Sequence, residues 1–273
     1  MTESGIGAPV RGSAWLSPRA LAWLGFYGLI LAAWIGVALM ARDAGVAGGP
    51  ADGLADIPAA FWAALCSSAA EAAPVALWAM WALMAAAMML PGFVPALRTF
   101  ADLGVAGATT GAGAAALVAG YLAVWLVAAA AGAASQWALA RWGMVTPAGA
   151  SLSPWLTAAL LLGAGAYQFS ALKAACLSRC RMPLTFFMQH WRPGAAAALA
   201  MGARLGLHCL GCCWALMALG FVGGTMNLAW MGAATLFMAL EKLPDLGRAL
   251  TRPAGWALIA AGGAMVLRAL NLV

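Results

Sequence analysis

The feature of this sequence that most restricts its fold is a series of long apolar stretches that carry almost no charge. Several exceed the ~18 residues that distinguish a membrane span from a buried helix of a soluble core. Only 8% of the residues are charged and 65% are hydrophobic, whereas soluble domains carry about 25% charged residues. In lipid only α-helices and closed barrels satisfy the backbone, and no stretch alternates with period two. The sequence therefore predicts an all-α, polytopic transmembrane helical bundle.

The hydropathy pattern predicts about seven spans, of which the sixth is the shortest. They are Ala20–Met40, Pro74–Leu97, Gly113–Leu139, Trp155–Leu177, Ala195–Gly220, Asn227–Leu240 and Gly255–Leu270. Residues 1–19 are predicted to be a flexible N-terminal segment, and residues 20–273 a single membrane domain. The first span lacks a small-residue cleavage site and is interpreted as a retained helix. Within the longest loop, Phe61–Ala70 is predicted to lie along the membrane interface.

The distribution of Lys and Arg predicts the orientation, because cytoplasmic loops carry an excess of both. With the N-terminus inside and the C-terminus outside, most basic residues fall on the inner side. These are Arg11, Arg19, Arg98, Lys173, Arg179, Arg181, Arg192, Lys242, Arg248 and Arg252. The predicted location is the inner (cytoplasmic) membrane of a bacterium. The net charge of +6 lies at span ends, which indicates contact with anionic lipid rather than with nucleic acid.

Three of the six cysteines lie inside the predicted fifth span, within a stretch of five residues. On a helix, Cys209 and Cys213 are one turn apart and Cys212 lies beside them. Thiolates are ligands for soft ions such as copper(I), and also for zinc. Buried cysteines can instead serve as small apolar packing residues. His208, next to this group, is a candidate ligand or proton acceptor, or a simple neighbour.

A second group, Cys176 and Cys180, shares one helical face near the predicted cytoplasmic end of the fourth span. Arg179 and Arg181 would favour their thiolate forms, or they are ordinary markers of the inner side. If the fourth and fifth spans are straight, the two cysteine groups are separated by ~20 Å along the membrane normal. We therefore expect two separate metal stations, with the better one in the outer half of the bundle.

Four methionines could complete the outer station. Met80 and Met84 lie one turn apart on the second span, and Met226 and Met231 open the sixth. With ~1.5 Å rise per residue, all four are predicted at the depth of the thiols in the fifth span. Such a set suits a copper(I) pocket, although methionines at helical spacing commonly serve packing.

Three charged residues fall inside predicted spans or directly at a span end, where a charge is costly and requires a partner. Lys173 and Glu241 are both predicted near the cytoplasmic ends of their helices, so they could pair or extend to the interface. Arg204 lies near the midplane of the fifth span and should face a partner, a cavity or an anion.

Five ordered motifs between about Pro74 and Lys242 resemble a bacterial family of predicted metal-binding integral membrane proteins, a domain of unknown function. The motifs are Trp81-x2-Met84-x2-Ala87-Met88-Met89-x-Pro91, Tyr167-x5-Lys173-x2-Cys176-Leu177-x2-Cys180-Arg181-x-Pro183, Gly202-x3-Gly206-x2-Cys209-x-Gly211-Cys212-Cys213-Trp214-x-Leu216-Met217, Gly224-x-Met226-Asn227-x2-Trp230-Met231 and Glu241-Lys242. The resemblance implies that both cysteine groups, the methionines and Lys173 are functional. His208 lies outside the residues that carry it.

The leading hypothesis is a membrane protein that binds a soft metal ion, copper(I) before zinc, for metal handling, transport or delivery. One alternative is a non-catalytic assembly or scaffold subunit of a membrane complex. Another is a membrane thiol–disulfide oxidoreductase, although cysteines on a regular helix pair poorly. A binding role is favoured over an enzymatic one. The Ala/Gly-rich helices predict a protein partner or a homo-oligomer within the lipid bilayer.

Overall fold

A computed structural model describes residues 18–43, 74–105 and 111–271. These residues contain helices and no β-strand, apart from one isolated bridge between Val145 and Ser151. The predicted all-α class is therefore confirmed for the described part of the chain. Cys66 and the predicted interfacial segment Phe61–Ala70 lie outside the described residues.

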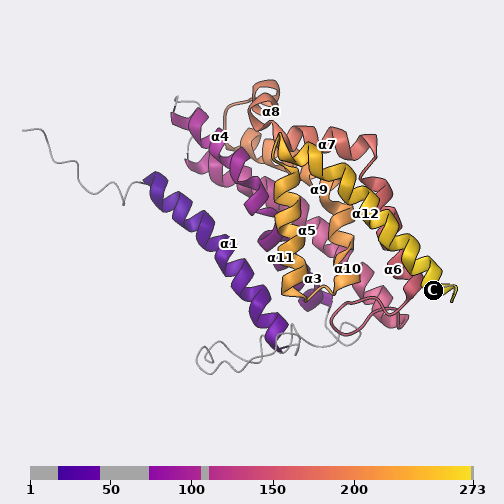
Figure 1. Cartoon of the computed structure of the whole chain (residues 1–273). Coiled ribbons are helices and arrows are strands. Elements are labelled where there is room, and N and C mark those ends of the chain that lie inside the picture. Colours follow the sequence, from indigo (N-terminus) through magenta and orange to yellow (C-terminus); the bar gives the residue numbers. More distant parts are fainter. Residues whose placement is uncertain (1–17, 44–73, 106–110, 272–273) are drawn as a thin grey trace, which may run out of the picture.

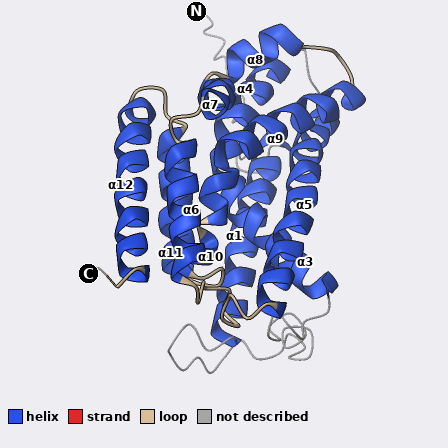
Figure 2. Cartoon of the chain, turned by 90° about the vertical axis from the view of Figure 1, so that its right-hand side faces the viewer, coloured by secondary structure: helices blue, strands red, loops and turns tan. Residues whose placement is uncertain are grey.

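The helices form an elongated bundle (Figures 1 and 2). They are α1 (Pro18–Asp43), α3 (Pro74–Met89), the 3-10 turn η2 (Pro91–Phe93), α4 (Val94–Val105), α5 (Gly111–Arg141), α6 (Pro154–Tyr167), α7 (Ala171–Arg181), α8 (Pro183–His190), α9 (Ala195–Ala218), α10 (Gly220–Gly223), α11 (Leu228–Glu241) and α12 (Leu246–Ala269). In both views α4, α7 and α8 gather at one end, and α10 and the C-terminus lie toward the other.

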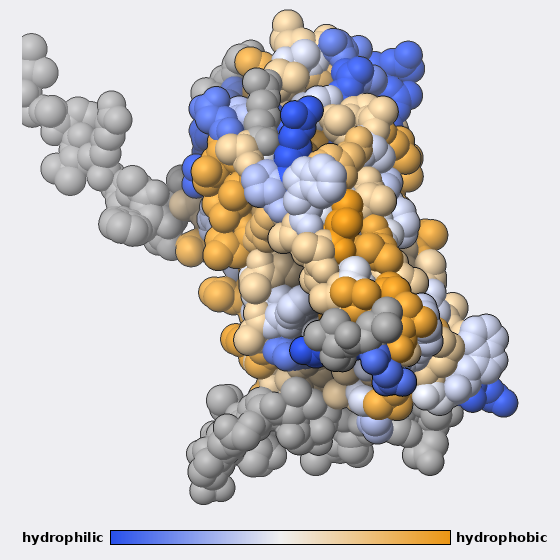
Figure 3. Space-filling model, turned by 45° about the vertical axis from the view of Figure 1, so that its right-hand side comes forward, coloured by the Kyte–Doolittle hydropathy of each residue, from blue (hydrophilic) through white to orange (hydrophobic). Residues whose placement is uncertain are grey.

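Four helical segments among the described residues are long and apolar enough to cross a membrane: α1, α5, α9 with α10, and α12. Two bent pairs, α3 with α4 and α6 with α7, raise the number to six if each pair is one span. α11, with 14 residues, is shorter. Apolar residues cover most of the middle of the face shown in Figure 3, and hydrophilic residues gather toward its ends. Four to six spans thus satisfy length and composition.

Two spans that the sequence predicts as continuous are broken. The predicted span Pro74–Leu97 bends by 44° after α3, because Pro91 lacks an N–H group and restricts the residue before it. The predicted span Trp155–Leu177 bends by 64° between α6 and α7. There Ser170 starts a new helix, because its hydroxyl accepts a hydrogen bond from the backbone N–H of Lys173. Figure 2 shows α7 nearly end-on, across the direction of the main helices.

The centre of the bundle is the contact between α5 and α9. It depends on small residues, because a Cβ atom at Gly202 would lie 2.0 Å from the carbonyl oxygen of Leu117. Close approach through glycine is a common way for helices to pack in membranes. This contact fixes α9 against α5 and leaves the other sides of α9 to α7, α6 and α11.

Candidate metal centre

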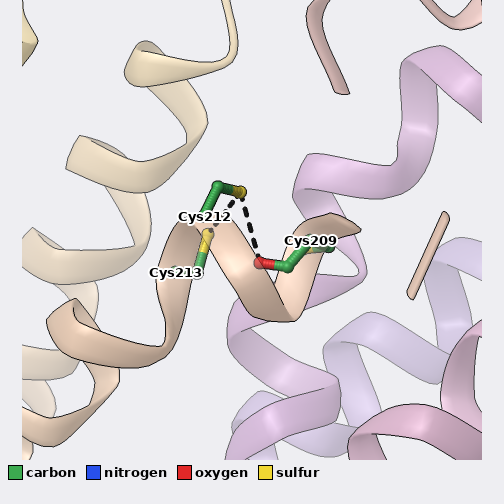
Figure 4. Close-up of side chains that lie close together, drawn as sticks. All are labelled: Cys209, Cys212 and Cys213. Atoms are coloured by element: carbon green, nitrogen blue, oxygen red, sulfur yellow. Dashed lines mark hydrogen bonds between the residues drawn. The ribbon is translucent and has the colours of Figure 1, made fainter. Parts of the chain in front are cut away.

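The thiols of Cys209, Cys212 and Cys213 form the core of the candidate site. These cysteines are 1–2% exposed, and their sulfur atoms all lie within 4.8 Å of one another. The Sγ atoms of Cys212 and Cys213 are 3.3 Å apart, and Cys212 Sγ is 3.2 Å from the main-chain oxygen of Cys209 (Figure 4). We call these three residues the thiol cluster.

The spacing of the thiol cluster fits a single soft ion. Two sulfurs that each bind an ion at ~2.3 Å can be at most ~4.6 Å apart. Three sulfurs around one ion are ~4.0 Å apart at that bond length, so the cluster, with one pair at 3.3 Å and all three within 4.8 Å, needs shifts of less than ~1 Å to hold one ion. Within the described residues it is the one group of three or more Cys, His, Asp or Glu side chains with such spacing.

Cys180 of α7 joins the thiol cluster from a second helix. Its thiol lies close enough to those of Cys209 and Cys212 to interact with them electrostatically, and its neighbour Cys176 lies directly beside Gly211 of α9. The expectation of two stations ~20 Å apart is therefore wrong. It assumed a straight helix through residue 177, whereas the 64° bend after α6 lays α7 against α9.

A tyrosine and a methionine complete the contacts of Cys209. The Tyr121 hydroxyl lies 3.0 Å from Cys209 Sγ and 3.2 Å from the main-chain oxygen of Met89. Met89 Sδ is 3.9 Å from the same Sγ atom. Phe93 stacks on the Tyr121 ring at 4.2 Å between centroids. No sequence signal singles out Tyr121, while Met89 belongs to the first motif of the family resemblance.

Lys242 places a positive charge directly at the thiols. Its Nζ atom lies 3.3 Å from Cys209 Sγ, and the residue is buried. The ammonium packs against Gly92, where a Cβ atom would be only 2.5 Å from Nζ. In the sequence, Lys242 stands out only as a basic residue of the inner side and as the last residue of the last motif of the resemblance. Its position offsets the negative charge that thiolates bring into a low-dielectric interior.

A buried ion pair fixes the helix that carries Lys242. Lys173 Nζ and Glu241 Oε2 are 2.8 Å apart, and their side chains are 1% and 2% exposed. Arg181 Nε also donates a hydrogen bond of 2.9 Å to the main-chain oxygen of Glu241. Of the two alternatives left by the sequence, pairing or extension to the interface, the structure has the pair. The pair joins α7 to the end of α11, next to Lys242, whose side chain extends to Cys209.

The four predicted methionine ligands are buried in the core. The contacts that α3 and the end of α11 make with Cys209 come from other residues. The last residue of α3, Met89, contacts Cys209, and Met80 lies ~13 Å earlier along that helix. α11 presents its C-terminal end to Cys209 through Lys242. Met231 lies ~16 Å of helix rise from Lys242, and Met226 contacts the α5–α6 loop through the oxygen of Ala148. Met80 and Met231 therefore lie farther along their helices than the expected common depth allows, whereas Met84, ~7.5 Å of helix rise before Met89, stays a predicted ligand.

Two further predicted residues face away from the thiol cluster. His208 is half-buried, and its ring meets the edge of Phe186 on α8 at 6.1 Å between centroids. Arg204 is exposed on the outer side of α9 rather than buried inside the bundle. Arg204 and His208 both lie outside the buried face of α9, which is the face that carries the thiols.

Fold and site together define an all-helical protein with several apolar helices and a buried thiol centre suited to a soft metal ion. The model of the copper chaperone family PpoB2 matches residues 78–265, more than half of the chain. The chain belongs to this copper chaperone family. The match includes every described cysteine and extends beyond the predicted limit at about Lys242 into α12. No curated protein and no solved structure matches the chain.

Proposed function

We propose that this protein is an integral membrane protein that binds copper(I) with the thiols of Cys209, Cys212 and Cys213 and delivers the ion onward. The observation that carries the proposal is the buried thiol cluster, whose sulfurs lie within 4.8 Å of one another, in a chain of a copper chaperone family. Soft thiolate ligands favour copper(I) over harder ions. Met89, whose Sδ atom lies 3.9 Å from Cys209 Sγ, is a further candidate sulfur ligand, as is the neighbouring Cys180.

The surroundings of the cluster favour an ion of low charge. Copper(I) held by two thiolates and one neutral thiol of the cluster carries one net negative charge, and the adjacent Lys242 ammonium would neutralise it. A neutral centre costs little in an apolar interior, whereas an uncompensated charge is expensive there. Zinc would need a third thiolate for the same balance, so the number of thiolates bound distinguishes the two metals.

Metal analysis of purified protein tests the proposal. Wild type and the triple variant Cys209→Ser/Cys212→Ser/Cys213→Ser are loaded with copper(I) in detergent without oxygen, washed and measured by mass spectrometry. We expect about one copper per wild-type chain and none in the triple variant, in keeping with thiolate selectivity. Ala200→Ser, an exposed change on the same helix, controls for the added hydroxyl groups. Equal copper in wild type and triple variant would refute the proposal, and retention of zinc alone would change the metal.

We also propose the membrane orientation that the basic residues predict, with the end that carries α4, α7 and α8 toward the cytoplasm. Arg98, Lys173, Arg179 and Arg181 all belong to α4 or α7, and such residues accumulate on the cytoplasmic side. Reporter fusions in a bacterial host test this: an alkaline phosphatase fused after the C-terminus should be active, because that enzyme folds only outside. An inactive phosphatase with a fluorescent C-terminal fusion would reverse the orientation.

A further inference from the structure

The thiols of the protein form a series that runs from a partly exposed helix to the buried centre. Cys176 and Cys180 are one turn apart on α7 and are both partly exposed, whereas the thiol cluster is 1–2% exposed. Cys180 lies near Cys209 and Cys212. Accessibility therefore falls from α7 toward α9.

Cys176, which the copper centre does not use, is seated against the cluster-bearing helix by a specific contact. A Cβ atom at Gly211 would lie 2.5 Å from Cys176 Sγ, so only glycine leaves room for this sulfur. Gly211 immediately precedes Cys212, and its main-chain oxygen accepts a hydrogen bond from the Tyr167 hydroxyl. Tyr167 itself packs on Trp214 at 5.0 Å between centroids. The sulfur of Cys176 is thus held beside the main chain of the cluster.

The rest of α7 suits a position at an aqueous boundary. It contains Ser178, Arg179 and Arg181 within a short stretch, and it lies at the end of the bundle that also carries α4 and α8 (Figure 1). A helix of this composition lies at the edge of the lipid rather than in its centre. An ion arriving from water at this end would meet the α7 thiols before the buried ones.

We propose that Cys176 is the thiol through which copper(I) enters and leaves the buried cluster, with Cys180 as the next sulfur along the route. The inference rests on the proposed copper function and adds the path of the ion. Cys176 acts as a transient ligand and is not part of the resting site.

The transfer is a ligand exchange without a change of oxidation state. A bond forms between Cys176 sulfur and copper(I) as the bond to the donor ligand breaks, and the Cys176 proton passes to the donor. Next, the Cys180 sulfur bonds to the ion, the bond to Cys176 breaks, and the proton of Cys180 passes to Cys176. The same exchange then places the ion on the thiol cluster. Copper remains +1 throughout, so no oxidant or reductant is required.

A residue on the route and a residue of the resting site have different kinetic signatures. Loss of a thiol on the route raises the barrier equally for loading and release, so both rates fall by the same factor and the equilibrium affinity is unchanged. Loss of a resting ligand weakens the affinity itself. The two roles are therefore separable by measuring both rates together with the equilibrium copper content.

The experiment compares wild type, Cys176→Ser and the neighbouring exposed control Ala175→Ser, all in detergent micelles without oxygen. Loading is followed by stopped-flow absorbance as copper(I) leaves its bicinchoninate complex, and release by adding excess chelator to the loaded protein. For Cys176→Ser we expect both rates to fall at least about tenfold, with copper content unchanged. Ala175→Ser should match wild type.

A second variant removes the contact and keeps the thiol. Gly211→Ala places a Cβ atom 2.5 Å from the present position of Cys176 Sγ, which displaces that sulfur, so loading and release should both slow. Wild-type rates in Cys176→Ser would overturn the route, as would a loss of copper content at unchanged loading rate. Wild-type protein that binds no copper would instead refute the proposed function, so the two failures are distinguishable.

Discussion

Replacing Lys173 with methionine removes the cation of an ion pair that is almost completely buried. Nζ of Lys173 and Oε2 of Glu241 are 2.8 Å apart, with side chains 1% and 2% exposed. At an effective dielectric constant of about 20, the attraction at this distance is about 6 kcal/mol. Desolvation offsets part of that attraction, but the single substitution leaves the Glu241 carboxylate buried and unpaired. We therefore expect Lys173→Met to lower the free energy of unfolding by about 3–5 kcal/mol.

A double-mutant cycle separates the pair from other effects of the substitutions. Glu241→Gln alone should cost a similar amount, while the double variant Lys173→Met/Glu241→Gln should recover about 2–3 kcal/mol. The exposed pair of Arg19 and Asp102 is a matched control. It has almost the same N–O distance, 2.7 Å, but side chains 54% and 69% exposed, so Asp102→Asn should cost no more than about 1 kcal/mol.

The free energies come from reversible unfolding in mixed detergent and dodecyl sulfate micelles, followed by circular dichroism. Additive single variants, with a coupling energy below about 0.5 kcal/mol, would contradict the reasoning. So would an Asp102→Asn variant as destabilised as Lys173→Met. Either result would mean that burial does not strengthen the pair between α7 and α11.

Three further predictions follow from the contacts of α9 and its neighbours. Gly202→Ala should destabilise the protein by more than about 1 kcal/mol in the same unfolding assay, because its Cβ atom would lie 2.0 Å from a carbonyl oxygen of α5. The cost of this clash should exceed the ~1 kcal/mol by which alanine is favoured over glycine in a helix. Gly163→Ala, with open space around the added atom, should be neutral or stabilising. Lys242→Met should weaken copper(I) binding about tenfold or more in a chelator competition titration, because the ammonium 3.3 Å from Cys209 Sγ is lost; unchanged affinity would contradict the charge argument. His208→Ala should leave copper content as in wild type, because the ring packs on α8, and a loss of copper would make it a ligand.

Most of the helical segments were predictable because apolar length is a local property of the chain. The predicted span Gly113–Leu139 lies within α5, Gly111–Arg141, and Asn227–Leu240 agrees with α11 to within one residue at each end. The breaks were harder. Pro91 was visible in the sequence as a helix breaker, but a new helix starting at Ser170 depends on a cap whose geometry no apolar pattern records.

The candidate site divides in the same way. The thiol cluster was predictable from Cys209, Cys212 and Cys213, because spacing along one helix places them on one face. The partners from other helices were not. Tyr121 occurs in an unremarked apolar stretch, and nothing in the spacing of the sequence indicated that Lys242 would reach Cys209.

The sequence by itself determined the helical class, the apolar segments and the soft-metal character of one helix face, since composition and helical periodicity act over short distances. Only the tertiary structure decided that the second cysteine group meets the first. That outcome depends on a 64° bend after α6, which converts a separation along a straight span into a contact between Cys176 and Gly211, the residue before Cys212. Depth along a span can be read from the sequence only while the helix remains straight, and the candidate site of this chain lies against a helix that follows a bend.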